Sequence, residues 1–201
     1  MKSLSFHSRR ESMTFIVSTQ RISVPALLFT ALIAMFPVAP PAHAASAAEI
    51  DGEVDRALSD FQKIDGASAF LGIAKGVLVF PKVYKAGIGV GGEYGEGALR
   101  VGGKTVDYYS TAAASFGFQL GAQAKSIVVI FTEESALRKF RESEGWKVGV
   151  DGSVALVDIG VGKAVDTTNI KDPVIGFIFG QKGLMYNLTL EGSKFTRLDK
   201  K

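Results

Sequence analysis

Closely spaced glycines in residues 76–97, GVLVFPKVYKAGIGVGGEYGEG, constrain the fold of this chain more than any other feature. In the middle of this stretch, residues 86–91 read AGIGVG, so glycines alternate with apolar residues. Successive side chains of a strand point to opposite faces, so one face would be apolar and the other nearly bare backbone. Because glycine weakens a strand, the pattern predicts close approach by another backbone, an aromatic ring or a ligand.

Short strand patterns surround these glycines. Residues 77–80 form an apolar run typical of a buried strand, and Pro81 is expected to limit its extension. Residues 93–97 are predicted to turn, and Gly102-Gly103 to form a two-residue hairpin loop. Strands are expected on both sides of that loop, over 98–101 and 104–109.

The second half of the chain repeats this theme. Residues 115–123, SFGFQLGAQ, have one aromatic and aliphatic face and one face of small or amide residues. Residues 127–131 are predicted to be a buried strand, after which Thr132 is expected to cap a helix. Strand-like alternation returns at Trp146, with Asp151-Gly152 as a hairpin signal. Gly160 and Gly162 repeat the glycine spacing of residues 86–91, and a loop is expected over 166–172. Strands are expected over 174–179 and 184–190 with a turn at 180–183 between them, followed by a short strand around Phe195.

Ahead of the glycine segment, the sequence predicts an amphipathic helix from Glu49 to about Asp65. Its apolar residues recur at helical spacing, and the other side is mainly acidic: the apolar set is Ile50, Val54, Ala57, Leu58, Phe61 and Ile64. Two interpretations stay open, a helix on a membrane surface and a helix packed on its own domain; the acidic polar face favours the second. With a shorter helix over 67–74, the elements predict an α+β fold, an antiparallel glycine-rich meander or barrel-like sheet with two or three helices.

Residues 1–44 have the features of a secretory signal that is cleaved after Ala44. Arg21 precedes an apolar run over 24–38, and small residues follow at 42–45. We therefore expect a single mature domain over 45–201, in the periplasm or secreted. The run is short for a membrane span.

Charge and composition exclude several functions of the mature chain. Residues 1–44 hold four basic residues and one acidic residue, so the remainder counts 19 of each and does not suggest a nucleic-acid partner. Both histidines, His7 and His43, lie in the predicted signal, and the chain has no cysteine. Without these residues there is no Ser-His-Asp triad, thiol nucleophile or His/Cys zinc site, so we expect no enzyme, metal or cofactor. The glycines also lack the strand-to-helix context of a nucleotide-binding loop.

Several motifs in a fixed order carry a resemblance to a known family. These are LVFPKVYKAGIGVGGEYGEG, YYS, SFGFQLGAQ, ALRKF, WKVGVDGSVA and LEGSKF, which together run from about Ala57 to Phe195. The chain resembles the SYLF domain family, whose members bind lipids and, in eukaryotes, also actin. The resemblance implies a compact lipid- or membrane-binding module. No actin is expected as a partner in an exported compartment.

The candidate lipid contacts are three lysines and two tyrosines around the first glycine segment. Lys75, Lys82 and Lys85 could contact phosphate head groups, while Tyr84 and Tyr94 have the amphipathic character favoured at membrane interfaces. An ordinary solvated surface is the alternative for each lysine. Two interpretations, an acyl pocket or plain core, stay open for the apolar set Ile88, Val90, Phe116, Phe118 and Leu120.

Two functions remain open at this point. The first is a non-catalytic exported protein that binds phospholipid peripherally or in a pocket, and the second is a structural or protein-interaction module of the cell envelope. The oligomeric state and the lipid are left open.

Overall fold

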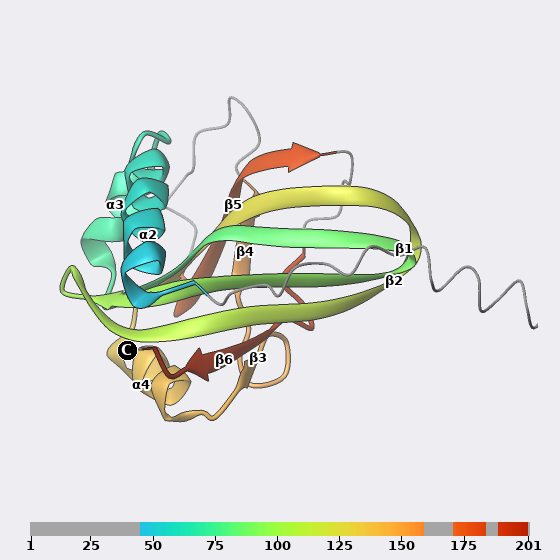
Figure 1. Ribbon diagram of the computed structural model, residues 1–201. Helices are drawn as coiled ribbons and strands as arrows, with labels where there is room; N and C mark the ends of the chain where they lie inside the picture. Colours follow the sequence, from blue (N-terminus) through green and yellow to red (C-terminus); the bar gives the residue numbers. More distant parts are fainter. Residues whose placement is uncertain (1–44, 159–170, 184–188, 201) are drawn as a thin grey trace, which may run out of the picture. The chain divides into compact units, whose positions relative to one another are not determined.

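A six-stranded, mostly antiparallel sheet with helices on both faces forms the fold (Figure 1). The computed structural model describes residues 45–158, 171–183 and 189–200, within the compact unit Ala44–Lys201. The described helices are α2 (Ala47–Gln62), α3 (Ala67–Ile73) and α4 (Glu134–Glu142). The strands are β1 (Gly76–Val101), β2 (Lys104–Phe131), β3 (Trp146–Lys147), β4 (Ala155–Asp158), β5 (Val174–Gly183) and β6 (Lys194–Leu198). The predicted α+β class is confirmed.

The long hairpin of β1 and β2 is the centre of the sheet. Its turn is Gly102-Gly103, as predicted, and both residues have positive φ angles, 57° and 79°, that favour glycine. On its other edge β2 pairs with β6 over residues 108–112 and with β5 over residues 123–131. The sheet continues with β4 parallel to β5 and β3 antiparallel to β6.

Two predicted interruptions of β1 are wrong. The strand runs through Pro81, and the pairing register shifts between Phe80 and Val83. A bulge at this point accommodates proline, which has no N–H to donate to a neighbouring strand. Residues 93–97 are also strand rather than turn, and pair with residues 109–113 of β2.

The glycines of β1 allow the strand to bend back on itself. A Cβ on Gly97 would lie 1.9 Å from the carbonyl oxygen of Val79, and one on Gly95 would lie 2.6 Å from that of Lys82. Nearer the bend, a Cβ on Gly87 would lie 2.3 Å from the Cα of Gly91. The predicted close approach is therefore confirmed at Gly87, and the approaching group is backbone. Backbone also approaches Gly95 and Gly97, which were predicted to lie in a turn. We call residues 76–87 of β1, before the bend, its first arm, and residues 90–101, after the bend, its second arm.

Hydrophobic cores lie on both faces of the sheet. On one face α2 buries its apolar side, as the amphipathic pattern predicted, and its N-terminus carries a capping box of Ser46 and Glu49. Phe61 packs against Phe177 with ring centroids 5.0 Å apart. Of the two interpretations of this helix, the structure therefore shows the helix packed on its own domain. On the other face α4 contributes Phe140 to a cluster in which Trp146 and Phe195 stack.

Three further local predictions are wrong. The N-cap of α4 is Glu133, whereas the Thr132 hydroxyl donates to the Asp172 carbonyl. The chain does turn at Asp151-Gly152, but the flanking segments pair with different strands, β6 and β5. Residues 180–183 continue β5 rather than turn. Gly160, Gly162, most of the loop predicted over 166–172 and most of the strand predicted over 184–190 lie outside the described residues.

Candidate functional site

The far end of the β1–β2 hairpin, beyond Val83, reaches past the helices (Figure 1). Val79 from the first arm of β1 and Ala98 from the second both pack in the core beneath α2, so the outer sides of the two arms form one surface. Beyond α2 this surface carries three large exposed side chains, those of Tyr84, Val90 and Tyr94. We call it the outer face; its smaller exposed members are Ala86, Gly92, Ala112, Ala114 and Ala122.

The inner side of the same hairpin end is polar. Because side chains alternate along a strand, Lys85 and Glu93 point away from the outer face, and both are buried. Thr111, Gln123 and Lys125 of β2 are buried with them. Half-buried sheets in water usually keep apolar residues inside and polar residues outside. The hairpin end has the opposite arrangement, with charged groups inside and tyrosine, valine and alanine outside.

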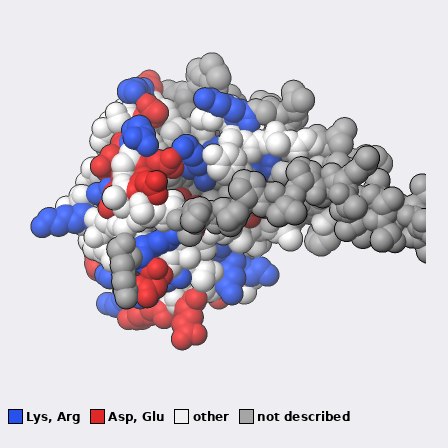
Figure 2. Space-filling model, in the orientation of Figure 1, with Lys and Arg blue, Asp and Glu red and all other residues white. Residues whose placement is uncertain are grey.

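A groove between α2 and the sheet lies beside the outer face. It has a volume of about 470 Å³, and its lining includes Lys82, Tyr84 and Lys182 together with Phe179. The Lys82 ammonium pairs with the Glu53 carboxylate of α2, and hydrogen bonding to Glu53 raises the pKa of Lys82. In the view of Figure 2 the charged side chains are densest over the helical half, and white atoms dominate the uncovered surface next to the hairpin end.

Tyr94 is held on the outer face by a neighbouring carboxylate. Its hydroxyl donates to the Glu96 side chain at 2.9 Å. Partial burial and this carboxylate raise the pKa of Tyr94 to about 12. The ring therefore presents an apolar surface to solvent, while its hydroxyl is neutral and partnered.

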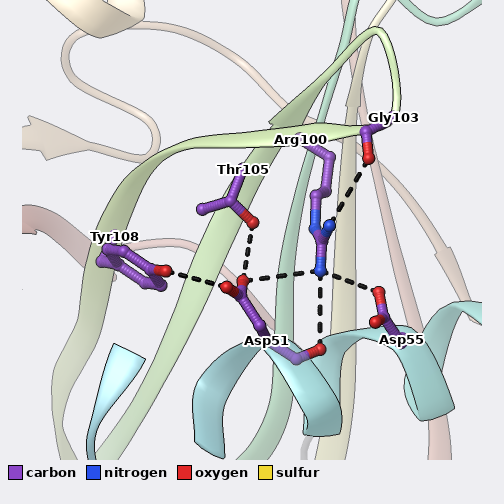
Figure 3. A network of polar contacts seen from close by, with 6 residues as sticks. All are labelled: Asp51, Asp55, Arg100, Gly103, Thr105 and Tyr108. Carbon is purple, nitrogen blue, oxygen red and sulfur yellow. Dashed lines mark hydrogen bonds and ion pairs between the residues drawn. The ribbon is translucent and has the colours of Figure 1, made fainter. Parts of the chain in front are cut away.

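The position of α2 on the sheet is fixed by Asp51, near the β1–β2 turn (Figure 3). Its carboxylate accepts hydrogen bonds from Thr105 at 2.6 Å and from Tyr108 at 2.9 Å. Arg100 bridges Asp51 and Asp55 across the same network, at 3.4 and 2.7 Å. Burial and the bond to Asp51 raise the pKa of Tyr108. These contacts hold the start of α2 at the turn end of the hairpin.

The structure brings together three of the five predicted lipid contacts. Lys82 and Tyr84 line the same groove, and Tyr94 lies on the same outer face in the second arm. Lys75 precedes β1 and lines a separate cavity beside Arg100, and Lys85 is buried on the inner side of the hairpin.

Both interpretations of the apolar set are wrong for Val90. This side chain is 62% exposed, so it belongs neither to an acyl pocket nor to the core. The side chains of Ile88, Phe116, Phe118 and Leu120 lie outside the described part of the structure.

The sequence reasoning missed Lys182 and the polar inner side. Period-two alternation from Lys82 would have separated Tyr84 from Lys85, because neighbouring side chains of a strand face opposite ways. The same alternation places Gln123 and Lys125 together on one side of β2. No sequence signal brings β5, and with it Lys182, to this groove.

No helix among the residues described is long and apolar enough to cross a bilayer. The described residues also contain no cluster of three or more His, Cys, Asp or Glu side chains that could hold a metal ion. The features of the site are thus an exposed apolar sheet face and a cation-bearing groove beside it.

Fold and site together describe a small α+β domain with an exposed apolar sheet face. Residues 112–201 match the model of the Ysc84 family, described as Las17-binding protein actin regulator. Over these residues the chain is similar to this family, the SYLF-domain family, which consists of lipid- or actin-binding modules rather than known enzymes. No curated protein sequence matches the chain.

Proposed function

We propose that this protein is an exported, non-catalytic lipid-binding protein that docks peripherally on phospholipid membranes through the outer face of the hairpin end. The observation that carries the proposal is the inverted arrangement of this end. Tyr84, Val90 and Tyr94 are 60%, 62% and 51% exposed, while charged side chains are buried behind them. Exposed apolar surface of this kind marks a contact site for an apolar partner.

The chemistry around the outer face favours a lipid interface as the partner. Tyrosine places its ring at the apolar boundary and its hydroxyl toward the polar head groups. Lys82 and Lys182 lie in the adjacent groove, where ammonium groups can meet lipid phosphates. Export rests on the signal-like residues 1–44, and it places the protein in the periplasm or outside the cell.

Vesicle flotation tests this proposal. The protein is mixed with vesicles of phosphatidylcholine alone or with phosphatidylglycerol, and we expect it to float with them. Val90→Asp places a charge on the outer face and should weaken binding by about tenfold or more. The matched control is Val150→Asp, because Val150 is 71% exposed but lies in the turn after β3.

A second function, a protein-interaction module of the envelope, uses the same apolar face. Under it the protein stays at the bottom of the gradient with both vesicle types, and cross-linking in cells captures one discrete protein. That combination of results would contradict membrane docking.

A further inference from the structure

Five polar side chains fill the interior of the bent hairpin end. They come from both arms of β1 and from β2, and each is at most 7% exposed: Lys85, Glu93, Thr111, Gln123 and Lys125. The pairing register sets Lys85 opposite Gln123, and Lys125 opposite Val83. Gly95, which pairs with Thr111 of β2, packs against Val83, so Glu93 of the second arm and Thr111 of β2 reach the same interior.

The charges of this interior do not balance. Lys125 Nζ lies 2.9 Å from Glu93 Oε2, and these side chains are 1% and 5% exposed. Lys85 is 5% exposed and makes no ion pair with any residue in the described ranges. Two ammonium groups and one carboxylate leave a formal charge of +1. Burying a charge without a partner costs several kcal/mol, so a counter-charge is expected.

Hydrogen-bonding capacity is also unused at the same place. Within the described residues, the Thr111 hydroxyl has no hydrogen-bond partner, and Lys125 Nζ makes no hydrogen bond besides its ion pair with Glu93. Two acceptors, Gln123 Oε1 and Glu93 Oε1, are also unpartnered, and these need a donor rather than an anion. Buried polar atoms are nearly always partnered, because each unpartnered one costs about 1–3 kcal/mol. Water could supply the hydrogen bonds, but water does not neutralise the charge. An apolar occupant would do neither.

We propose that the interior of the bent hairpin binds one oxyanion, a carboxylate or a phosphate group, between Lys85 and Lys125. The Thr111 hydroxyl, which has no partner among the described residues, is a further hydrogen-bond donor to this group. The anion is either a free small ion or the acidic head of an amphiphile. This site lies on the inner side of the hairpin, and it does not depend on membrane docking by the outer face.

Equilibrium dialysis without vesicles tests the site. The protein is dialysed against labelled acetate, phosphate or decanoate, with chloride keeping the ionic strength constant. We expect saturable binding of one equivalent. Retention of acetate or phosphate indicates a free anion, and retention of decanoate alone indicates an amphiphile head; either supports the proposal. Absence of saturable binding of all three probes overturns it.

Two substitutions with opposite expected effects make the test specific. Lys85→Met keeps a long unbranched side chain and should weaken binding about tenfold or more, because the site loses its unpaired cation. Glu93→Gln raises the formal interior charge and should strengthen binding. Lys104→Met, at the exposed start of β2, is the matched control and should bind as wild type.

Folding of each variant is checked by the fluorescence of Trp146, the single tryptophan, which is buried. If Lys85→Met does not fold, the proposal is tested with Glu93→Gln alone. Anion binding by Glu93→Gln that is equal to or weaker than that of the wild type overturns the proposal. Wild-type affinity in a folded Lys85→Met variant overturns it as well. Because vesicles are absent, this result is independent of the flotation result.

Discussion

Gly97 leaves no room for a side chain, because the first arm of β1 crosses directly over it. A Cβ at this position would lie 1.9 Å from the Val79 carbonyl oxygen and 2.8 Å from the Phe80 ring. Backbone at this point belongs to the centre of the sheet and has little freedom to move aside. The bend of the hairpin therefore depends on this glycine.

We expect Gly97→Ala to lower the free energy of unfolding by more than about 3 kcal/mol, since overpacking here displaces backbone. Gly92→Ala is the control, because a Cβ on Gly92 meets nothing within 4 Å. It should change the stability by less than about 0.5 kcal/mol. Urea unfolding followed by Trp146 fluorescence measures both variants. Equal stabilities would show that the arms of β1 do not cross as described.

Because of Tyr94, we expect the stability of the fold to fall at alkaline pH. Partial burial and the Glu96 carboxylate raise its pKa from 10.0 to about 12, so the folded state holds the proton more tightly than the unfolded chain. The stability from this contact is fully present below pH 10 and is lost as the pH rises toward 12. Wild type and Tyr94→Phe are titrated by ultraviolet absorbance, and the curve of the variant is subtracted from that of the wild type. The difference curve should have its midpoint near pH 12. A midpoint at 10 would contradict the contact.

At the scale of elements, α2 is attached to the sheet by its apolar face and by Asp51. Removing the carboxylate leaves Arg100, Thr105 and Tyr108 without a shared acceptor. Asp51→Ala should therefore lower the unfolding free energy by about 2 kcal/mol. Asp60→Ala, which removes an exposed pair with Lys63, should cost less than about 0.5 kcal/mol. Urea unfolding compares the two, and similar values would contradict a locking role for Asp51.

Sequence patterns predicted those elements correctly whose structure depends on neighbouring residues in the chain. The amphipathic spacing identified α2, and Gly102-Gly103 identified the hairpin turn, because periodicity and positive φ are properties of short segments. Pro81 and residues 93–97 were predicted as breaks because proline and glycine usually interrupt strands. A bulge and a bend replace those breaks here, and both depend on pairing with β2 across the sheet.

The candidate site was predictable only in part, because burial depends on which strands meet. Tyr84 and Tyr94 were identified from residue type, and they are exposed. Lys85 has the same type as Lys82 but points inward, since the bulge at Pro81 and strand alternation set its side. The parallel pairing of β4 with β5 joins segments separated by a connection longer than a hairpin loop, so no hairpin signal precedes it.

For the whole molecule, the hairpin divides into two ends with different surroundings. The turn end is covered by α2 and tied to it by Asp51, whereas the far end is apolar outside and charged inside. The helices thus lie at one end of the hairpin, and the exposed apolar face lies at the other end (Figure 1). We propose that the far end meets the membrane, so labels there and elsewhere should respond differently to vesicles.

The absence of cysteine allows this to be measured directly with single labels. An environment-sensitive fluorophore is attached to Val90→Cys on the outer face or to Val150→Cys, both exposed positions. On addition of phosphatidylglycerol-containing vesicles, we expect the label at position 90 to shift to the blue and gain intensity, and the label at position 150 to stay unchanged. No response at position 90, or equal responses at both positions, would contradict docking through the outer face.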